Sequence, residues 1–178
     1  MKIDARSLLL AVSLPVLLSS PPEAPAQDGA VGLVAAVRDA ASRYKTPAAA
    51  RDAGYEPILG CVSAPEEGAM GLHFANGALV ADGVLDASQP ELLVYEPKQS
   101  GGLRLVAVEF VVIAEAWDAA NEAPPVLDGQ LFNFVGAPNR YGLPPFYELH
   151  VWAFRENPHG MFVDWNPQVT CEHFAPVQ

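Results

Sequence analysis

One run near the middle of the chain constrains the fold most, because it is apolar on both faces. In residues 103–114, LRLVAVEFVVIA, odd and even positions point to opposite sides of a β-strand, and both sets are mainly apolar. Such a strand is buried on both sides. Its one acidic residue, Glu109, then lies in the core, where a charged carboxylate must be paired, protonated or bound to a metal. Arg104, Arg140 and Arg155 are the candidate ion-pair partners.

Two other apolar runs carry a histidine near their middle. In residues 70–75, MGLHFA, His73 shares a strand face with a small residue on either side, which leaves space above the imidazole. In residues 146–152, FYELHVW, His150 shares a face with Glu148, because side chains two positions apart point to the same side. Together with the central run, these strands supply two imidazoles and two carboxylates.

This set of side chains is typical of a mononuclear metal site. If the three strands are neighbours, we expect His73, Glu109 and His150 to bind one divalent transition metal, namely zinc, copper, manganese or iron. Glu148 is then a fourth ligand or a hydrogen-bond partner of a ligand. Two histidines and one carboxylate leave coordination positions open, so the chain could be a small metalloenzyme. The alternatives are a metal-free barrel that binds a small apolar or aromatic ligand, metal-free acid–base chemistry, and an interaction module whose His and Glu side chains only satisfy one another.

Three further residues are candidates for ligand binding. Trp152 lies beside His150 in the last strand, Arg140 lies in the polar loop before it, and Asn76 follows the strand of His73. Arg140 could contact an anionic ligand. The chain has no G-x-S-x-G nucleophile motif, no phosphate-binding glycine loop and no H-E-x-x-H motif. Serine-hydrolase, nucleotide-binding and HExxH-protease chemistry are therefore not expected.

The order of the elements predicts an α+β fold. Apolar residues recur at helical spacing over residues 30–45, and Thr46-Pro47 begins a short second helix that Gly54 ends. After Gly54, short strand-like runs alternate with turn residues, which indicates an antiparallel sheet. We expect N-terminal helices packed on an antiparallel β-barrel or strongly curved sheet. The expected strands are near residues 57–62, 70–75, 91–96, 103–114, 130–135 and 146–154.

The N-terminal residues 1–26 predict a secretory signal peptide. Two basic residues precede an apolar run over 7–18, and an A-x-A cleavage site follows at 24–26. The run has about 12 residues, whereas a membrane-spanning helix needs about 20. An uncleaved anchor is the alternative. We therefore expect a secreted or periplasmic protein with a single domain over residues 27–178.

Two cysteines, Cys61 and Cys171, predict one disulfide in an oxidising compartment. Neither has the C-x-x-C partner that is typical of a thiolate metal site, so metal ligation by the two thiolates is the weaker alternative. The bond would close a loop of about 110 residues. The chain-entropy model gives such a loop about 4–5 kcal/mol of stabilisation.

The net charge of -11 restricts the partners. Residues 1–26 contain two basic and two acidic side chains, so signal cleavage would leave the charge unchanged. An acidic domain without a basic patch is not expected to bind nucleic acid or anionic membrane surfaces. We expect a small molecule or a metal ion as the partner, and no membrane insertion after cleavage. The sequence leaves the oligomeric state open.

Two long motifs carry a resemblance to a known group of proteins. MGLHFAN, residues 70–76, and ELHVWAFRENPHGMFVDWNPQVTC, residues 148–171, resemble an uncharacterised family of exported bacterial proteins with M-G-x-H-x-x-N and E-L-H-x-W…N-P-x-G-x-F…W-N-P motifs. The similarity runs from about Gly54 to Cys171. It implies export and a common fold, and it assigns no catalytic residue.

Overall fold

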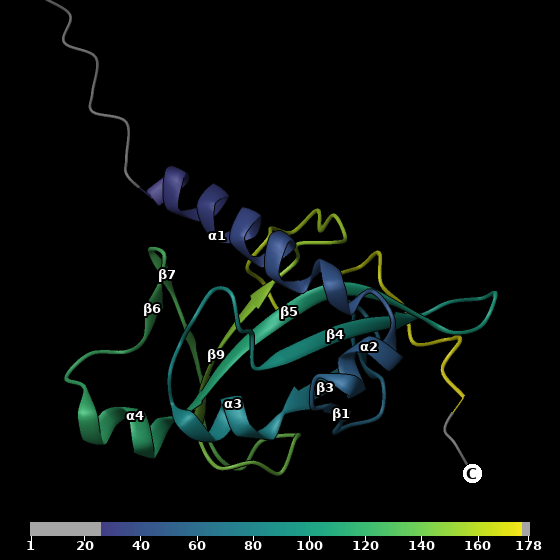
Figure 1. Cartoon of the computed structure of the whole chain (residues 1–178). Coiled ribbons are helices and arrows are strands. Elements are labelled where there is room, and N and C mark those ends of the chain that lie inside the picture. The colour runs from purple at the N-terminus through teal and green to yellow at the C-terminus, as the bar shows by residue number, and fades with distance from the viewer. Residues whose placement is uncertain (1–25, 176–178) are drawn as a thin grey trace, which may run out of the picture.

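The computed structural model describes residues 26–175, and the signal peptide expected over 1–26 lies outside this range except for its last residue. Figure 1 shows an α+β arrangement in which helices pack against an antiparallel sheet. The helices are α1 (Ala26–Ala41), the 3-10 turn η1 (Ser42–Tyr44), α2 (Pro47–Asp52), α3 (Gly77–Asp82) and α4 (Ala114–Ala120). None of the helices in the described part of the chain has the length and apolarity to cross a membrane.

Seven strands form the main sheet, and two short strands pair separately. The main sheet contains β1 (Tyr55–Pro57), β2 (Val62–Ala64), β3 (Gly68–Asn76), β4 (Leu92–Pro97), β5 (Leu103–Ile113), β8 (Asn133–Val135) and β9 (Phe146–Val151). The order is β1-β3-β4-β5-β9-β8, with β2 also paired to β3. The separate hairpin contains β6 (Val126–Leu127) and β7 (Gln130–Leu131).

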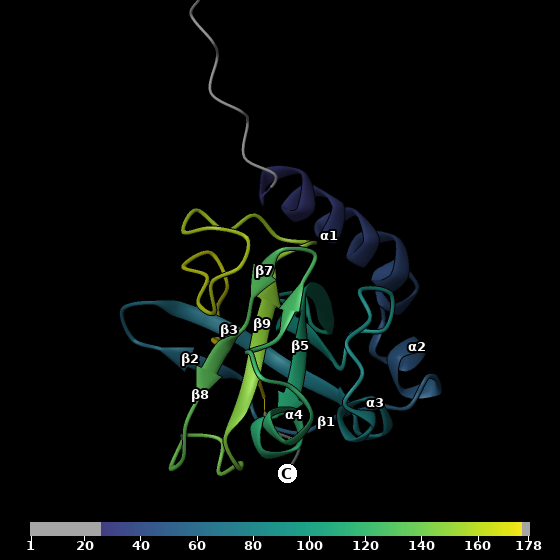
Figure 2. The ribbon, with the colours of Figure 1, turned by 90° about the vertical axis from the view of Figure 1, so that its left-hand side faces the viewer.

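The sheet is open rather than closed. Strands β1 and β8 stand at the two ends of the order, so the described strands form no closed barrel and that alternative is not confirmed. Figure 2 shows β3 running across β5 and β9 at a steep angle, as in a strongly twisted sheet. All pairings in the sheet are antiparallel. The twist brings side chains of β3 toward those of β5, although β4 lies between them.

Helix α1 covers one face of this sheet. Helix α1 buries an apolar stripe that includes Leu33 and Val37, and this stripe belongs to the same core cluster as Val108 and Phe110 of β5. The helix begins at Ala26, four residues before its expected start. The expected cap of α2 is confirmed, because the backbone N–H of residue 49 donates to the Thr46 hydroxyl at 3.3 Å.

The opposite face is partly covered by the segment that follows β9. This C-terminal segment lies against β3 through a bridge between Ala69 and Asn166, and it is joined to the loop before β2 by the Cys61–Cys171 disulfide. The sulfur atoms are 2.01 Å apart, so the expected disulfide is confirmed. In Figure 2 the segment appears as yellow loops beside the upper ends of β3 and β9. It covers part of the sheet face on which Glu109 lies.

Candidate metal centre

The register of the strands places two histidines and a glutamate on one face of the sheet. Glu109 of β5 pairs directly with His150 of β9, and on its other side it pairs with Leu92 of β4. His73 of β3 pairs with Val94, which lies two positions from Leu92. Directly paired residues share a face, and so do residues two apart. His73, Glu109 and His150 therefore point to the side opposite α1.

The three side chains also meet. His73 Nε2 lies 3.4 Å from Glu109 Oε2, and His150 Nδ1 lies 3.9 Å from Glu109 Oε1. The two imidazole rings are edge-on, with centroids 5.8 Å apart. One ligand atom from each residue lies within 4.8 Å of the others. Ligands of one zinc ion, each about 2 Å from the metal, lie within about 4 Å of one another. The cluster could therefore hold a metal ion after small side-chain movements.

No cationic side chain in residues 26–175 neutralises Glu109. The basic groups within 4.0 Å of its carboxylate in this part of the chain are the two histidines, which would form an ion pair only if protonated. The three arginines considered from the sequence bind elsewhere: Arg104 pairs with Glu96, Arg140 donates to the carbonyl of residue 63, and Arg155 donates to that of residue 168. Because Glu109 is only 5% exposed, its charge has to be balanced by a proton or by a bound cation.

Burial in the cluster favours neutral imidazoles and raises the pKa of the Glu109 carboxyl group. Burial lowers the pKa of His73 to about 4, and burial together with His73 lowers the pKa of His150 well below its usual value. Burial and the neighbouring Glu148 raise the pKa of Glu109 well above its usual range. At neutral pH both imidazoles are therefore neutral, which is the form that ligates a metal.

His150 has no hydrogen-bond partner within the described residues on either ring nitrogen, and it is 0% exposed. A buried N–H or ring nitrogen without a partner costs free energy comparable to a lost hydrogen bond. Its ring is held by stacking on Trp152, at 5.8 Å between centroids, and Trp152 is itself fixed by a 2.6 Å bond from Nε1 to the carbonyl of residue 163. Coordination to a cation would give one of these nitrogens a partner.

Glu148 is the second carboxylate of the cluster. It is 3% exposed and lies on the same face as Glu109, since its direct partner on β5 is Val111. Burial raises the pKa of Glu148 to about 7, although a hydrogen bond from Glu109 acts in the opposite direction. In the absence of a metal the two carboxyl groups are therefore expected to share a proton. A bound dication would favour the charged form of both.

A largely apolar cavity of about 240 Å³ opens onto the cluster. His73, Glu109 and Glu148 line its polar part, together with the half-buried Tyr141. Its apolar walls include Ile58, Leu92, Val111, Ile113, Leu143 and Phe146. The Tyr141 hydroxyl lies 3.5 Å from the sulfur of Met70. Neither Tyr141 nor the loop residues at the rim were found from the sequence, because loops give no periodic signal that aims their side chains.

The three ligand-binding candidates lie outside the walls of this cavity. Trp152 lies behind His150, and Arg140 stacks its guanidinium over Trp165 at 5.2 Å. Asn76 caps α3 by accepting from two backbone N–H groups, and it also donates to the carbonyl of residue 53 at 3.2 Å. A ligand-binding role for Trp152, Arg140 and Asn76 stays a prediction, because the contacts above are all within the protein.

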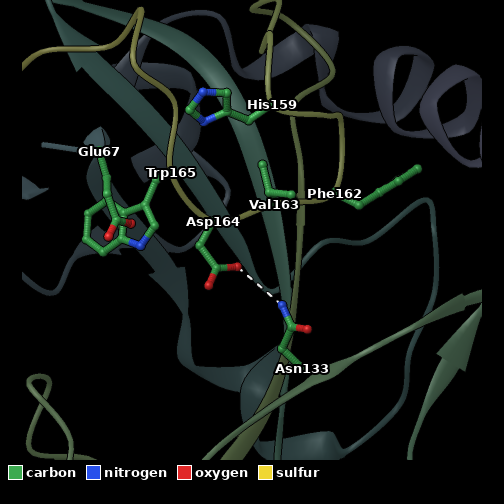
Figure 3. Close-up of a pocket in the computed structure, with 7 residues that line it drawn as sticks. All are labelled: Glu67, Asn133, His159, Phe162, Val163, Asp164 and Trp165. Atoms are coloured by element: carbon green, nitrogen blue, oxygen red, sulfur yellow. Dashed lines mark hydrogen bonds between the residues drawn. The ribbon is translucent and has the colours of Figure 1, made fainter.

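A second, more open cleft of about 460 Å³ lies beside the C-terminal segment (Figure 3). Asp164 and Asn133 are turned toward each other there, with 3.4 Å between Asn133 Nδ2 and Asp164 Oδ1. Burial raises the pKa of Asp164, and its charge contributes to the raised pKa of Glu148. In Figure 3 the side chain of His159 lies apart from this pair. The cleft therefore presents no cluster of ligands comparable to that around Glu109.

Comparisons of the chain with protein-family models, with curated proteins and with solved structures found no match. Each of the two motifs that carry the resemblance noted in the sequence contributes one histidine to the cluster, His73 and His150. Membership of that exported family stays a prediction.

Proposed function

We propose that this chain is an exported metal-binding protein in which His73, Glu109 and His150 hold one divalent transition metal. The observation that carries the proposal is a buried cluster of two imidazoles and a carboxylate, with no lysine or arginine paired to that carboxylate in the described chain. Nitrogen and carboxylate oxygen ligands suit zinc, copper, manganese or iron. Glu148 would act as a fourth ligand or as a hydrogen-bond acceptor beside the metal.

The site also has the features of a small metalloenzyme. Three protein ligands leave at least one coordination position open, and the apolar cavity gives that position access from outside. When bound, the metal would act as a Lewis acid toward a coordinated oxygen. The residues of this chain would supply the rest: Glu148 accepts a hydrogen bond beside that oxygen, and the apolar walls restrict water. The disulfide supports the proposal of a secreted or periplasmic location.

Elemental analysis tests the metal site directly. The purified chain, dialysed against a mixture of zinc, copper, manganese and iron salts, should retain about one equivalent of one metal. His73→Ala and His150→Ala should lose it. Two matched controls, His159→Ala and His173→Ala, remove exposed imidazoles outside the cluster and should retain it. Metal-free wild-type protein, or unchanged content in all four variants, would contradict the proposal.

A metal-free binding protein for a small apolar or aromatic ligand is the second candidate. The apolar cavity beside the cluster favours it. In that case His73, Glu109 and His150 would only be partners of one another. The two candidates make different predictions for elemental analysis, since only the first requires a bound metal.

A further inference from the structure

The residues that line the cavity beside the cluster become less exposed from its rim to its floor. At the rim, Ile58 is 47% exposed and Leu143 is 41% exposed. At the floor, His73 and Glu148 are each 3% exposed, and Glu109 is 5% exposed. A molecule that enters at the apolar rim therefore brings its leading end to the proposed metal ligands.

We propose, on the basis of the metal site proposed above, that the cavity binds a small uncharged alcohol or phenol with a single-ring apolar body. The ring occupies the apolar walls, and the hydroxyl group lies at the floor. There the hydroxyl oxygen meets the metal and its hydrogen is donated to Glu148. The proposal rests on three features of the cavity: its size, its charge and the position of its polar atoms.

The size limits the ligand to about one ring. The cavity has a volume of about 240 Å³. An apolar cavity of about 150 Å³ is enough to bind benzene, whereas sites for drug-sized molecules have about 300–1,000 Å³. A monocyclic ring with a short substituent fits between these limits. Larger fused-ring ligands do not fit without displacement of a wall.

The charge of the floor selects against acids. Lysine and arginine are absent from the residues that line the cavity, whereas Glu109 and Glu148 both reach it. A divalent metal would balance these two carboxylates, so an uncharged ligand leaves the buried site neutral. A ligand carboxylate would add an unbalanced negative charge beside Glu148, which is unfavourable at this depth.

The polar atoms of the floor select for a hydroxyl group over a purely apolar ligand. Glu148 offers an acceptor, and the open position of the metal accepts a lone pair. A hydroxyl group satisfies both at once. Toluene has the same ring as benzyl alcohol and satisfies neither, so it would leave a buried acceptor without a partner.

Binding of three matched probes tests the proposal. Benzyl alcohol, toluene and benzoate are titrated by NMR into metal-loaded protein, whose metal content is measured on the same samples. We expect benzyl alcohol to bind at least about tenfold more tightly than toluene or benzoate. The advantage over toluene should fall after the metal is removed with a chelator, because the hydroxyl group then keeps only its contact with Glu148. No binding by the loaded protein, tighter binding of benzoate, or an equal affinity for toluene would overturn the proposal.

Two variants separate occupancy of the cavity from folding and from metal binding. Ala75→Phe places a ring in the cavity from the face of β3 that carries His73, and it should abolish benzyl alcohol binding with the metal retained. Ala119→Phe adds the same ring on the exposed side of α4 and should change neither property. Unchanged alcohol binding by a folded, metal-loaded Ala75→Phe protein would overturn the assignment to this cavity. Absence of metal from wild-type protein would instead contradict the proposed function, and with it this inference.

Discussion

Replacing Glu109 by glutamine should have opposite effects on stability with and without metal. Burial raises the pKa of Glu109 well above its ordinary value of 4.5, so the folded protein holds this proton more tightly than the unfolded chain does. This difference destabilises the folded state as pH rises above 4.5. The interval from 4.5 to 7 is 2.5 pH units, and each unit corresponds to about 1.4 kcal/mol, so the cost reaches at most about 3 kcal/mol.

Glutamine removes this cost because it is neutral at every pH. Its amide N–H can donate to Glu148 as the protonated carboxyl does. In a chelator at pH 7, Glu109→Gln should therefore raise the free energy of unfolding by up to about 3 kcal/mol. For a chain of this size, that gain corresponds to an increase in Tm of up to about 10 °C. At pH 4.5 the gain should vanish.

With metal bound, Glu109→Gln should lower the free energy of unfolding relative to wild type instead of raising it. At a free concentration 1,000 times its Kd, a metal that binds only the folded state adds about 4.1 kcal/mol, which exceeds the gain of up to about 3 kcal/mol from glutamine. Glutamine is a poorer ligand than a carboxylate, so the variant should lose most of this stabilisation. Thermal unfolding is followed by circular dichroism, with excess zinc and with a chelator, and exposed Glu66→Gln is the matched control. A variant that is less stable than wild type in the chelator at pH 7 would refute the idea that the Glu109 charge has no partner.

Two further predictions concern residues outside the cluster. Burial raises the pKa of Glu91 from its ordinary value of 4.5 to about 8, so this residue lowers the free energy of unfolding increasingly as the pH rises from 4.5 toward 8. Glu91→Gln can still accept the N–H of Val111, and it should flatten this pH dependence. Urea unfolding between pH 5 and 8 measures the effect, and an unchanged slope would contradict the prediction. Replacing Cys61 and Cys171 together by alanine should lower the free energy of unfolding by about 4–5 kcal/mol. Guanidinium unfolding measures this loss, and a loss below about 1 kcal/mol would contradict the chain-entropy reasoning.

The strands and their faces were predictable from the sequence, because the two-residue period assigns each polar side chain to a side. This period placed Glu148 and His150 on one face, as the register of β9 shows. It could not show that β9 lies next to β5, or that β4 separates β5 from β3, because strand order depends on contacts between distant parts of the chain. The convergence of His73 with Glu109 follows from that order and from the twist of the sheet.

Other features depend on local backbone geometry that residue types indicate only weakly. The last strand was expected to reach residue 154, but it ends at Val151, after which the backbone N–H of Ala153 turns back and donates to the carbonyl of Val151. Within β3, Gly71 has a φ of 119°, and an added Cβ would lie 2.6 Å from the carbonyl oxygen of Tyr95. This glycine accompanies the register shift between β2 and β3, and the sequence shows only that a glycine is there.

The barrel alternative is not confirmed, because the two end strands of the described sheet do not pair with each other. Closure would require β1 and β8 to pair, but each has only three residues, and each stands at an end of the strand order. The expected strand over 130–135 is divided between β7, which pairs with β6, and β8, which pairs with β9. The alternation of residues predicts extended structure here, but it does not determine which partner each part takes.

Anomalous X-ray diffraction from crystals of the metal-loaded protein, collected at the absorption edge of the bound metal, tests the central claim most directly. We predict one strong peak within about 2.2 Å of a ring nitrogen of His73, a ring nitrogen of His150 and a carboxylate oxygen of Glu109. The account would be contradicted if wild-type protein that retains one equivalent of metal showed its peak beside other residues, with none of these three side chains bound to the metal.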